Sequence, residues 1–420
     1  MLITIFIIGY LAIVFEGPLR INKTATALLT GVLAWTVIAL GASDPRVVEV
    51  ALGEMFGEVA PILFFLLAAM TIVEVIDAHS GFEVITSAIR ATSRRKLLLV
   101  IGAFTFVLSA ILDNLTTTIV MVSLLRRLVR EEEDRLRYTA LIVIAANAGG
   151  VASPIGDVTT TMLWMNHQIT GPAVVRATSI PALVSVLVPG LLIGLRMKGN
   201  VQPPPREEAD ECRVLPSDQR IVLFTGIAVL LFVPVFKVMT HLPPVMGILL
   251  GLGALWIVTE LLHRKVDHGP RKLSVVSALE RIDAASILFF LGILAAVGAL
   301  KNEGVLSNLA STIDSHLHDY RATALIVGMA SSVIDNVPLV AATQSMYSLT
   351  TFPTDHPFWL FLTFCAGTGG SILIIGSAAG IAAMGLERIT FGWYLRHFSL
   401  PVLLGYLAGA AVQALMLTQL

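Results

Sequence analysis

Charge is scarce in this sequence. Asp, Glu, Lys and Arg make up only 14% of its 420 residues, whereas hydrophobic residues make up 56%, and the mean hydropathy is +0.84. Since soluble domains carry roughly 25% charged residues, an ordinary soluble domain is excluded. Apolar runs of membrane-spanning length recur along the whole chain. They predict an all-α polytopic membrane protein whose first partner is the lipid bilayer.

Cysteine is scarce too, and neither sign of charge dominates. The two cysteines, Cys212 and Cys365, lie far apart in the sequence, so no disulfide framework and no cysteine metal cluster is predicted. The formal net charge of −1 says little, because the distribution of charge along the chain matters more than its sum. No nucleic-acid partner is predicted. The sequence leaves a homodimer open.

Most of the apolar runs have the length of one membrane crossing. Two stretches, 97–128 and 322–350, do not, because one helical crossing needs about 20 residues and two need about 40. Each has Asp-Asn near its middle, in "SAILDNLTTTIV" and "SSVIDNVPLVAA". We predict re-entrant hairpins with polar tips here. Ten segments are predicted as full spans: 2–15, 25–42, 60–77, 138–165, 178–197, 221–240, 244–262, 283–300, 358–385 and 397–418.

The basic residues give these segments a direction. If both hairpins re-enter, nearly all of the 28 Lys and Arg residues fall on one side, which is the cytoplasmic side by the positive-inside rule. Lys23 is among these cytoplasmic residues, and both termini are predicted outside. The exceptions, predicted outside, are Arg46, Arg176, Lys237, Lys301 and Arg321.

The two halves of the chain match in order. After each hairpin comes a glycine-broken segment, "NAGGVASPIGDVTTT" from 147 and "GTGGSILIIGSAAGI" from 367. Each half holds five predicted spans plus one hairpin, and an odd number of spans inverts the second half. Two inverted repeats with discontinuous helices at the midplane are typical of secondary transporters. The predicted divisions are a first repeat at 1–197 (hairpin 97–128, broken helix 138–165), a cytoplasmic linker at 198–220, and a second repeat at 221–420 (hairpin 322–350, broken helix 358–385).

Three aspartates, Asp113, Asp157 and Asp335, fall within these apolar segments. A charged side chain at membrane depth costs about 2.5–3.5 kcal/mol on insertion scales, so it indicates a functional site. A buried aspartate can also be held by a basic residue, but no Lys or Arg falls within these segments. The remaining candidates are amides and hydroxyls: Asn114, Asn147, Ser153, Thr159, Thr160, Asn336, Thr368, Ser371 and Ser377.

Oxygen ligands of these kinds suit a small hard cation. We predict Na+ at Asp113, Asn147, Asp157 and Asp335. Simpler interpretations exist for some of the residues. Asn114 and Asn336 can cap helices, and Ser109 and Ser331 are expected to bond back to their own helices.

The hairpins "DNLTT" and "IDNVPL", together with "NAGGVASPIGDVTT" and "GTGGSILIIGSAAG", resemble the NhaD-type sodium/proton antiporters. The resemblance runs from about Leu11 to the C-terminus. It implies exchange of Na+, often also Li+, for protons across a bacterial inner membrane, or across a plastid envelope in plants. It implies no enzymatic activity and no cofactor beyond the transported ions. The polar site it implies comprises Asp113, Asn114, Asn147, Asp157, Thr159, Thr160, Asp335, Asn336 and Ser371.

Rival functions remain open at this point. The wider superfamily is similar to arsenite or antimonite permeases and to carboxylate carriers. The Ser-Asn-Thr motifs typical of dicarboxylate carriers are absent from both sites, and three aspartates disfavour an anionic substrate. An intramembrane aspartyl protease would also need two buried aspartates, but its Gly-x-Gly-Asp signature is missing.

Overall fold

The computed structural model describes all of the 420 residues except 15, 87–92, 202–214, 265–272, 318 and 419–420. Cys212 and most of the predicted linker 198–220 therefore lie outside the described residues. Within them the fold is helical and contains no strand, apart from a single bridge between Ser93 and Asn200. This confirms the predicted all-α class.

Seven of the described helices are long and apolar enough to cross a membrane: α3 (Lys23–Gly41), α4 (Pro45–Ala78), α10 (Gly171–Gly194), α11 (Pro216–Thr240), α12 (Pro244–His263), α14 (Ala284–Asn302) and α21 (Ser399–Leu417). The predicted span 2–15 forms the shorter apolar helix α1 (Leu2–Val14). Short helices connect the longer ones: α2 (Glu16–Leu19), α5 (Gly81–Thr86), α13 (Val275–Arg281), α15 (Val305–His316) and α20 (Phe391–His397).

Helix α4 begins well before the predicted start at residue 60. Asp44 caps it by accepting a hydrogen bond from the Arg46 backbone N–H over 2.9 Å, and Pro45 occupies the first turn, where its missing N–H costs nothing. The helix then continues through Pro61 for 34 residues in all. At 1.5 Å per residue it is about 50 Å long, which exceeds the hydrocarbon core of a bilayer.

The stretch 97–128 folds as two helices, α6 (Arg94–Ser109) and α7 (Asn114–Leu128), with Asp113 between them. Both pack on α8 (Glu132–Gly150). The Nε atom of Arg94, at the start of α6, lies 2.7 Å from the carboxylate of Asp134, just beyond the end of α7. The outer ends of α6 and α7 therefore lie together, and the stretch is a helical hairpin.

The stretch 322–350 has the same form. Helices α16 (Tyr320–Ala330) and α17 (Asn336–Met346) meet at Asp335. Tyr320 at the start of α16 and Tyr347 after the end of α17 both make edge-to-face contacts with Phe358, with ring centroids 6.5 and 5.1 Å away. Phe358 begins α18 (Pro357–Gly369), so the outer ends of this hairpin also lie together.

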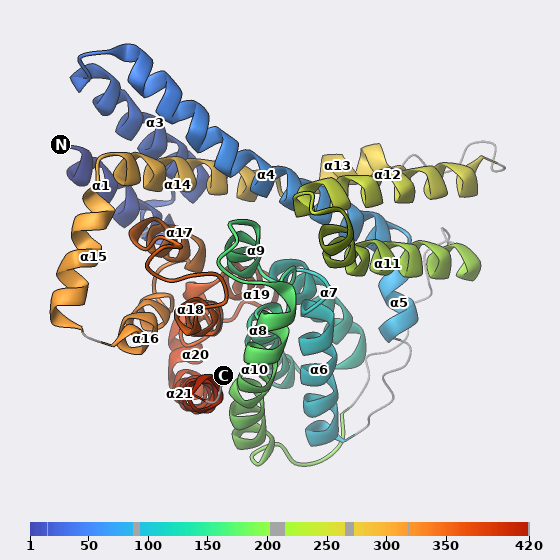
Figure 1. Cartoon of the computed structure of the whole chain (residues 1–420). Coiled ribbons are helices and arrows are strands. Elements are labelled where there is room, and N and C mark those ends of the chain that lie inside the picture. Colours follow the sequence, from blue (N-terminus) through green and yellow to red (C-terminus); the bar gives the residue numbers. More distant parts are fainter. Residues whose placement is uncertain (15, 87–92, 202–214, 265–272, 318, 419–420) are drawn as a thin grey trace.

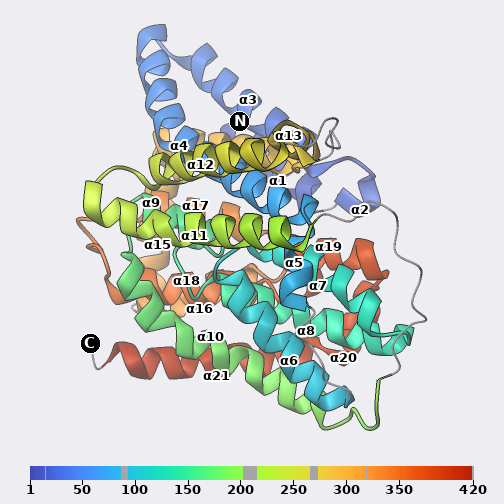
Figure 2. The same ribbon diagram turned by 90° about the vertical axis from the view of Figure 1, so that its right-hand side faces the viewer.

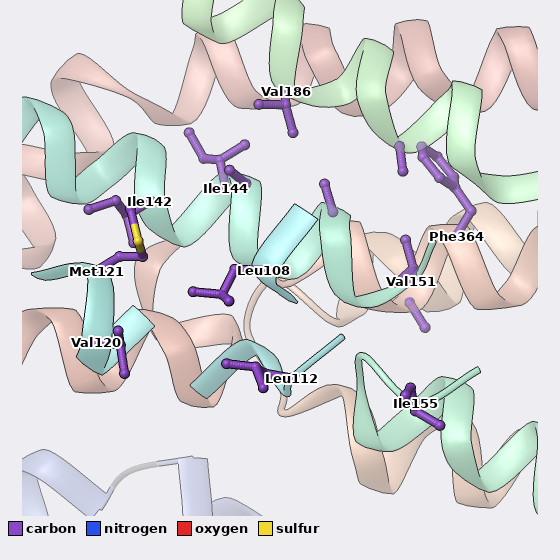
Figure 3. Packing of buried hydrophobic residues seen from close by; sticks show 14 of the residues in the cluster. Leu108, Leu112, Val120, Met121, Ile142, Ile144, Val151, Ile155, Val186 and Phe364 are labelled. Carbon is purple, nitrogen blue, oxygen red and sulfur yellow. The ribbon is translucent and has the colours of Figure 1, made fainter. Parts of the chain in front are cut away.

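The two predicted broken helices are broken at their glycine pairs. Helix α8 ends at Gly150 and α9 (Val158–Met165) starts after Asp157. Likewise α18 ends at Gly369, a short 3₁₀ turn follows (η2, Ile374–Gly376), and α19 (Ala378–Glu387) starts after Ser377. Figure 3 shows Leu108, Leu112 and Ile155 packed around the first of these breaks.

Close contacts between hairpin and broken helix recur at both places. A Cβ at Gly149 would lie 2.2 Å from the Phe106 carbonyl oxygen, and one at Gly369 would lie 2.0 Å from that of Gly328. Ser109 and Ser331 were expected to bond back to their own helices, and this is wrong. Their hydroxyls donate to Ala146 O and Ala366 O, over 2.6 and 2.7 Å, because these close approaches bring the neighbouring carbonyls within reach.

The elements form two layers (Figures 1 and 2). One layer holds α1, α3, α4, α11, α12 and α14, and the other holds both hairpins, both broken helices, α10 and α21. Helices α10 and α21 lie side by side (Figure 2), and small residues such as Gly405 allow their backbones to touch. The polar residues of the hairpin tips face the boundary between the two layers.

Candidate functional site

Four helix starts carry the polar residues of the two breaks. Asp113 accepts a hydrogen bond from Thr116 N over 2.8 Å at the start of α7, and Asp157 from Thr159 N over 3.3 Å at the start of α9. Asp335 and Ser377 cap α17 and α19 in the same way. The partial positive charge of a helix N-terminus stabilises a carboxylate. Capping and a site role thus fall on the same residues, and the caps are the aspartates, not Asn114 and Asn336.

Asn114 joins the first hairpin to the first broken helix. Its Nδ2 group donates to Asp157 Oδ1 over 2.9 Å and to Asn147 Oδ1 over 3.0 Å. The Nδ2 group of Asn147 in turn donates to the hydroxyls of Ser371 and Ser377, over 2.8 and 2.9 Å. A chain of buried side-chain hydrogen bonds therefore crosses from one half of the sequence to the other.

The three aspartates meet at one cavity of about 60 Å³, which Asn114 and Asn336 also line. This volume is enough for a small cation with a few waters. The other lining residues are mostly apolar and come from both layers, such as Phe289 of α14 from one layer and Leu115 of α7 from the other. A low-dielectric wall strengthens the field of the carboxylates. The arrangement can thus hold a monovalent cation, or protons, at carboxylates that apolar walls surround.

The remaining predicted site residues are not among those that line the cavity. Thr159 donates its hydroxyl to Asp157, which orients that carboxylate. Asn147, predicted as an Na+ ligand, is not among the lining residues and reaches them through Asn114. Ser153 and Thr368 donate to the backbone carbonyls of Ala110 and Phe364, which is a structural use of both hydroxyls.

Thr160 and Asn336 each keep a buried polar atom without a protein partner. These atoms are the hydroxyl of Thr160 and the Nδ2 group of Asn336. Asn336 lines the cavity, so its amide is placed to meet whatever the cavity holds. The structure leaves the assignment of Na+ ligands a prediction.

A basic residue that sequence reasoning missed faces the same cavity. The Nζ atom of Lys23 lies 3.4 Å from Asp335 Oδ2 and 4.5 Å from the centre of the Phe289 ring. The motifs that carry the three aspartates contain no Lys or Arg, but α3, which lies outside these motifs, places Lys23 at the cavity. Nothing in the local sequence of Lys23 signals this, because the contact joins residues 312 positions apart.

Two larger hollows lie beyond the cavity. One, of about 370 Å³, shares Lys23, Met70, Val73, Leu115, Ser286 and Ala378 with it and extends to Glu74, Asp77 and Arg281. The other, of about 340 Å³, is lined by residues such as Glu58, Lys301 and Gln344 and has no lining residue in common with the cavity. Leu66 and Val337, which line the cavity, and Met162, which lines this hollow, belong to one buried apolar cluster.

Comparison with known proteins decides the family. A family model described as a citrate transporter matches residues 10–350. Sodium/proton antiporter 1 of Arabidopsis thaliana is 48% identical over 412 residues, which cover 97% of this chain and 70% of the relative. The Na(+)/H(+) antiporter NhaD of Halomonas elongata is 30% identical over 98% of this chain and 87% of its own length. This chain belongs to the NhaD-type sodium/proton antiporter family.

Membership of the NhaD-type family confirms the resemblance predicted from the hairpin and glycine motifs. It also makes the chain a multi-pass membrane transporter and not an enzyme, which removes the aspartyl protease from the rival functions. Sodium/proton antiporter 2 of Arabidopsis thaliana, at 47% identity over 96% of both chains, supports the same assignment.

Proposed function

We propose that this protein exchanges Na+, and Li+ with it, for protons across a membrane. The observation that carries the proposal is the meeting of Asp113, Asp157 and Asp335 at one small cavity between the two helical layers. Carboxylate oxygens replace the water of a small hard cation, and they are also the groups that take up protons. The names of the relatives point to the same pair of ions.

Competition for the carboxylates couples the two ions. The amide of Asn114 and the hydroxyl of Thr159 donate to Asp157, and Thr116 donates its hydroxyl to Asp113 over 2.5 Å. These donors fix the carboxylate oxygens toward one occupant. When protons neutralise the carboxylates, the carboxyl groups no longer attract Na+, and the cation leaves. When Na+ arrives, the protons leave in their turn.

Alternating access would come from movement of one layer against the other. We infer that residues 1–197 and 221–420 are two inverted repeats, each with one re-entrant hairpin. The matching contacts of Gly149 and Gly369, and those of Ser109 and Ser331, support this. The cavity lies at the boundary of the layers, so sliding would close the hollow on one side and open it on the other.

The membrane and its sidedness belong to the proposal as well. The charge distribution supports cytoplasmic loops on the side of Arg281 and an outer face on the side of Lys301. Both termini then lie outside. We infer the inner membrane of a bacterium, and a plastid envelope is the alternative that the resemblance allows.

A carboxylate substrate is the second candidate, because the matching family model is described as a citrate transporter. Three aspartates against one lysine around the cavity would repel such an anion.

The test measures proton movement in everted membrane vesicles with a pH-sensitive dye on addition of Na+, Li+, K+ or citrate. Wild type should release protons from the vesicles with Na+ and Li+, and Asp157→Asn should abolish this. Asp44→Asn, which neutralises an exposed carboxylate at the start of α4 and keeps its capping oxygen, is the matched control and should retain exchange. A wild type that ignores every cation but accumulates citrate would overturn the proposal.

A further inference from the structure

We propose that Lys23 is an internal counter-cation that withholds Asp335 from ion exchange, so that Na+ and protons compete at Asp113 and Asp157 alone. This inference rests on the proposed antiport function. It changes the predicted set of Na+ ligands by removing Asp335 from it, and it assigns a positioning role to a residue outside all the polar motifs.

Two partners hold the ammonium group of Lys23 at the cavity wall. Asp335 Oδ2 lies 3.4 Å from Nζ on one side, and the Phe289 ring centre lies 4.5 Å away on another. The side chains of Lys23 and Asp335 are only 19% and 13% exposed. A cation over an aromatic face beside a carboxylate is held more firmly than a surface ion pair, because both contacts are shielded from water.

The backbone of Lys23 is fixed by the layer opposite the hairpin. Helices α3 and α14 touch along their backbones, since a Cβ at Gly31 would lie 2.6 Å from Gly292 O. Thr24 donates its hydroxyl to Ala285 O over 3.0 Å, one residue beyond Lys23. The Lys23–Asp335 pair therefore bridges the two layers across the cavity.

Charge around the cavity gives the pair its consequence. Lys23 is the basic residue among the cavity-lining residues, against three aspartates. Three free carboxylates would carry a charge of −3 and hold a monovalent cation or protons very strongly. With Asp335 neutralised by Lys23, two carboxylates remain, and their field is weak enough for release.

Other charged groups of both signs lie near Lys23, and the substitutions at Lys23 leave these groups in place. Lys23 also lines the hollow of about 370 Å³, so an ion that enters from there passes its ammonium group. The charged and titratable groups that face this region from the packed elements are Tyr10, Glu16, Glu74, Asp77, Asp113, Asp157, Arg281, Asp283 and Asp335.

The test compares Lys23→Gln, Lys23→Arg and wild type in proteoliposomes containing the full chain, with Na+-dependent exchange measured from pH 6 to pH 9. In Lys23→Gln the cavity is more negative, so protons compete more strongly with Na+. The activity profile should move to higher pH by about one unit, because the freed Asp335 carboxylate adds a like charge to the cavity that it shares with Asp113 and Asp157. Lys23→Arg keeps the charge and should keep the wild-type profile.

Lys96→Gln is the matched control, because it removes an exposed lysine of α6 that lines neither the cavity nor either hollow. It should leave the profile in place. An unshifted profile in Lys23→Gln, with active wild type, would overturn the role of Lys23 and leave antiport standing. Absence of exchange in wild type would instead remove the proposed function and this inference with it.

A second variant covers the case in which Lys23→Gln does not assemble. Lys23→Gln/Asp335→Asn removes both charges together and leaves Asp113 and Asp157 as the free carboxylates. It should restore assembly and exchange, and its activity profile should be shifted from that of wild type by less than one pH unit. An assembled double variant without Na+-dependent exchange would show that Asp335 is itself an ion ligand and would contradict the proposal.

Discussion

Asn114 donates to the Asp157 carboxylate over 2.9 Å, which ties the residue after the first hairpin break to the residue before α9. Both side chains are buried and both line the cavity. The amide thus holds one oxygen of the Asp157 carboxylate in place without adding charge to the site. A hydrogen bond to a charged group contributes about 1.5–3 kcal/mol.

Asn114→Ala should therefore weaken Na+ binding while leaving all three carboxylates in place. We expect the half-saturating Na+ concentration to rise about tenfold or more, because each 1.4 kcal/mol corresponds to a factor of ten. Exchange assays in proteoliposomes over a range of Na+ concentrations measure this. Asn308→Ala, at an exposed position of α15, is the control. Equal half-saturation in both variants would show that the amide does not act on the site.

The glycine contact between α16 and α18 makes a prediction about stability. In Gly369→Ala the new methyl group would meet the Gly328 carbonyl oxygen at 2.0 Å, and backbone cannot turn aside as a side chain can. We expect the free energy of unfolding to fall by about 3 kcal/mol or more. Thermal unfolding of the detergent-purified protein, followed by size-exclusion chromatography, reports the change.

Gly57→Ala supplies the comparison for Gly369→Ala. Nothing lies within 4 Å of a Cβ at Gly57, and alanine is the better helix former by about 1 kcal/mol. The melting temperature of this variant should stay level or rise. A fall as large as that of Gly369→Ala would mean that loss of glycine, and not the contact with Gly328, is the cause.

Much of this fold could be predicted because membranes impose simple length rules. Stretches of 97–128 and 322–350 are too long for one crossing and too short for two, and each is a helical hairpin in the structure. Asp113, Asp157 and Asp335 were recognisable because charge in an apolar segment is costly. They meet at one cavity.

The features that could not be predicted depend on contacts between distant segments. Lys23 belongs to the site only because α3 packs on α14 and faces the second hairpin. Ser109 bonds to Ala146 O because the glycine of a neighbouring helix lets two backbones approach. Sequence periodicity describes one helix at a time and carries no information on which helix lies opposite.

His79, one residue beyond the end of α4, predicts a pH dependence of stability. Its ring is buried, stacks on His263 at 5.2 Å and bonds to Val75 O over 2.7 Å. Burial lowers the pKa of the His79 imidazole below its usual 6.5. The unfolded chain therefore takes up this proton at higher pH than the folded one. Neutral His79 thus contributes to the free energy of unfolding in full above about pH 6.5. This contribution is lost as the pH falls toward the pKa of His79 in the folded protein.

His79→Phe keeps the ring and removes the titration. Between pH 7 and pH 5 its melting temperature in detergent should fall less than that of wild type. His397→Phe is the control, because exposed His397 makes the same kind of bond, to Trp393 O over 2.8 Å. The melting temperature of this variant should fall as much as that of wild type on acidification. If the melting temperature of His79→Phe also falls as much as that of wild type, protonation of His79 does not contribute to acid destabilisation.

The two hollows predict from which side of the membrane the cavity is reached in this conformation. Ser286 lines both the cavity and the hollow near Arg281, whereas Ser345 lines the separate hollow near Lys301. We introduce Ser286→Cys or Ser345→Cys into a Cys212→Ser/Cys365→Ala background and label with a membrane-impermeant maleimide. Ser286→Cys should react in everted vesicles, where the cytoplasmic face is outside, and Ser345→Cys in right-side-out vesicles.

Na+ should also change the labelling of Ser286→Cys, because an ion at Asp113 and Asp157 lies in the cavity that this residue lines. We expect slower labelling with Na+ than with K+ at alkaline pH, and no difference at acidic pH, where protons occupy the carboxylates. Ser345→Cys should show no direct protection, since its hollow shares no lining residue with the cavity, and Leu66, Met162 and Val337, each lining one or the other, pack in one apolar cluster. Labelling of both cysteines from the same face would contradict the separation of the two hollows by these apolar residues.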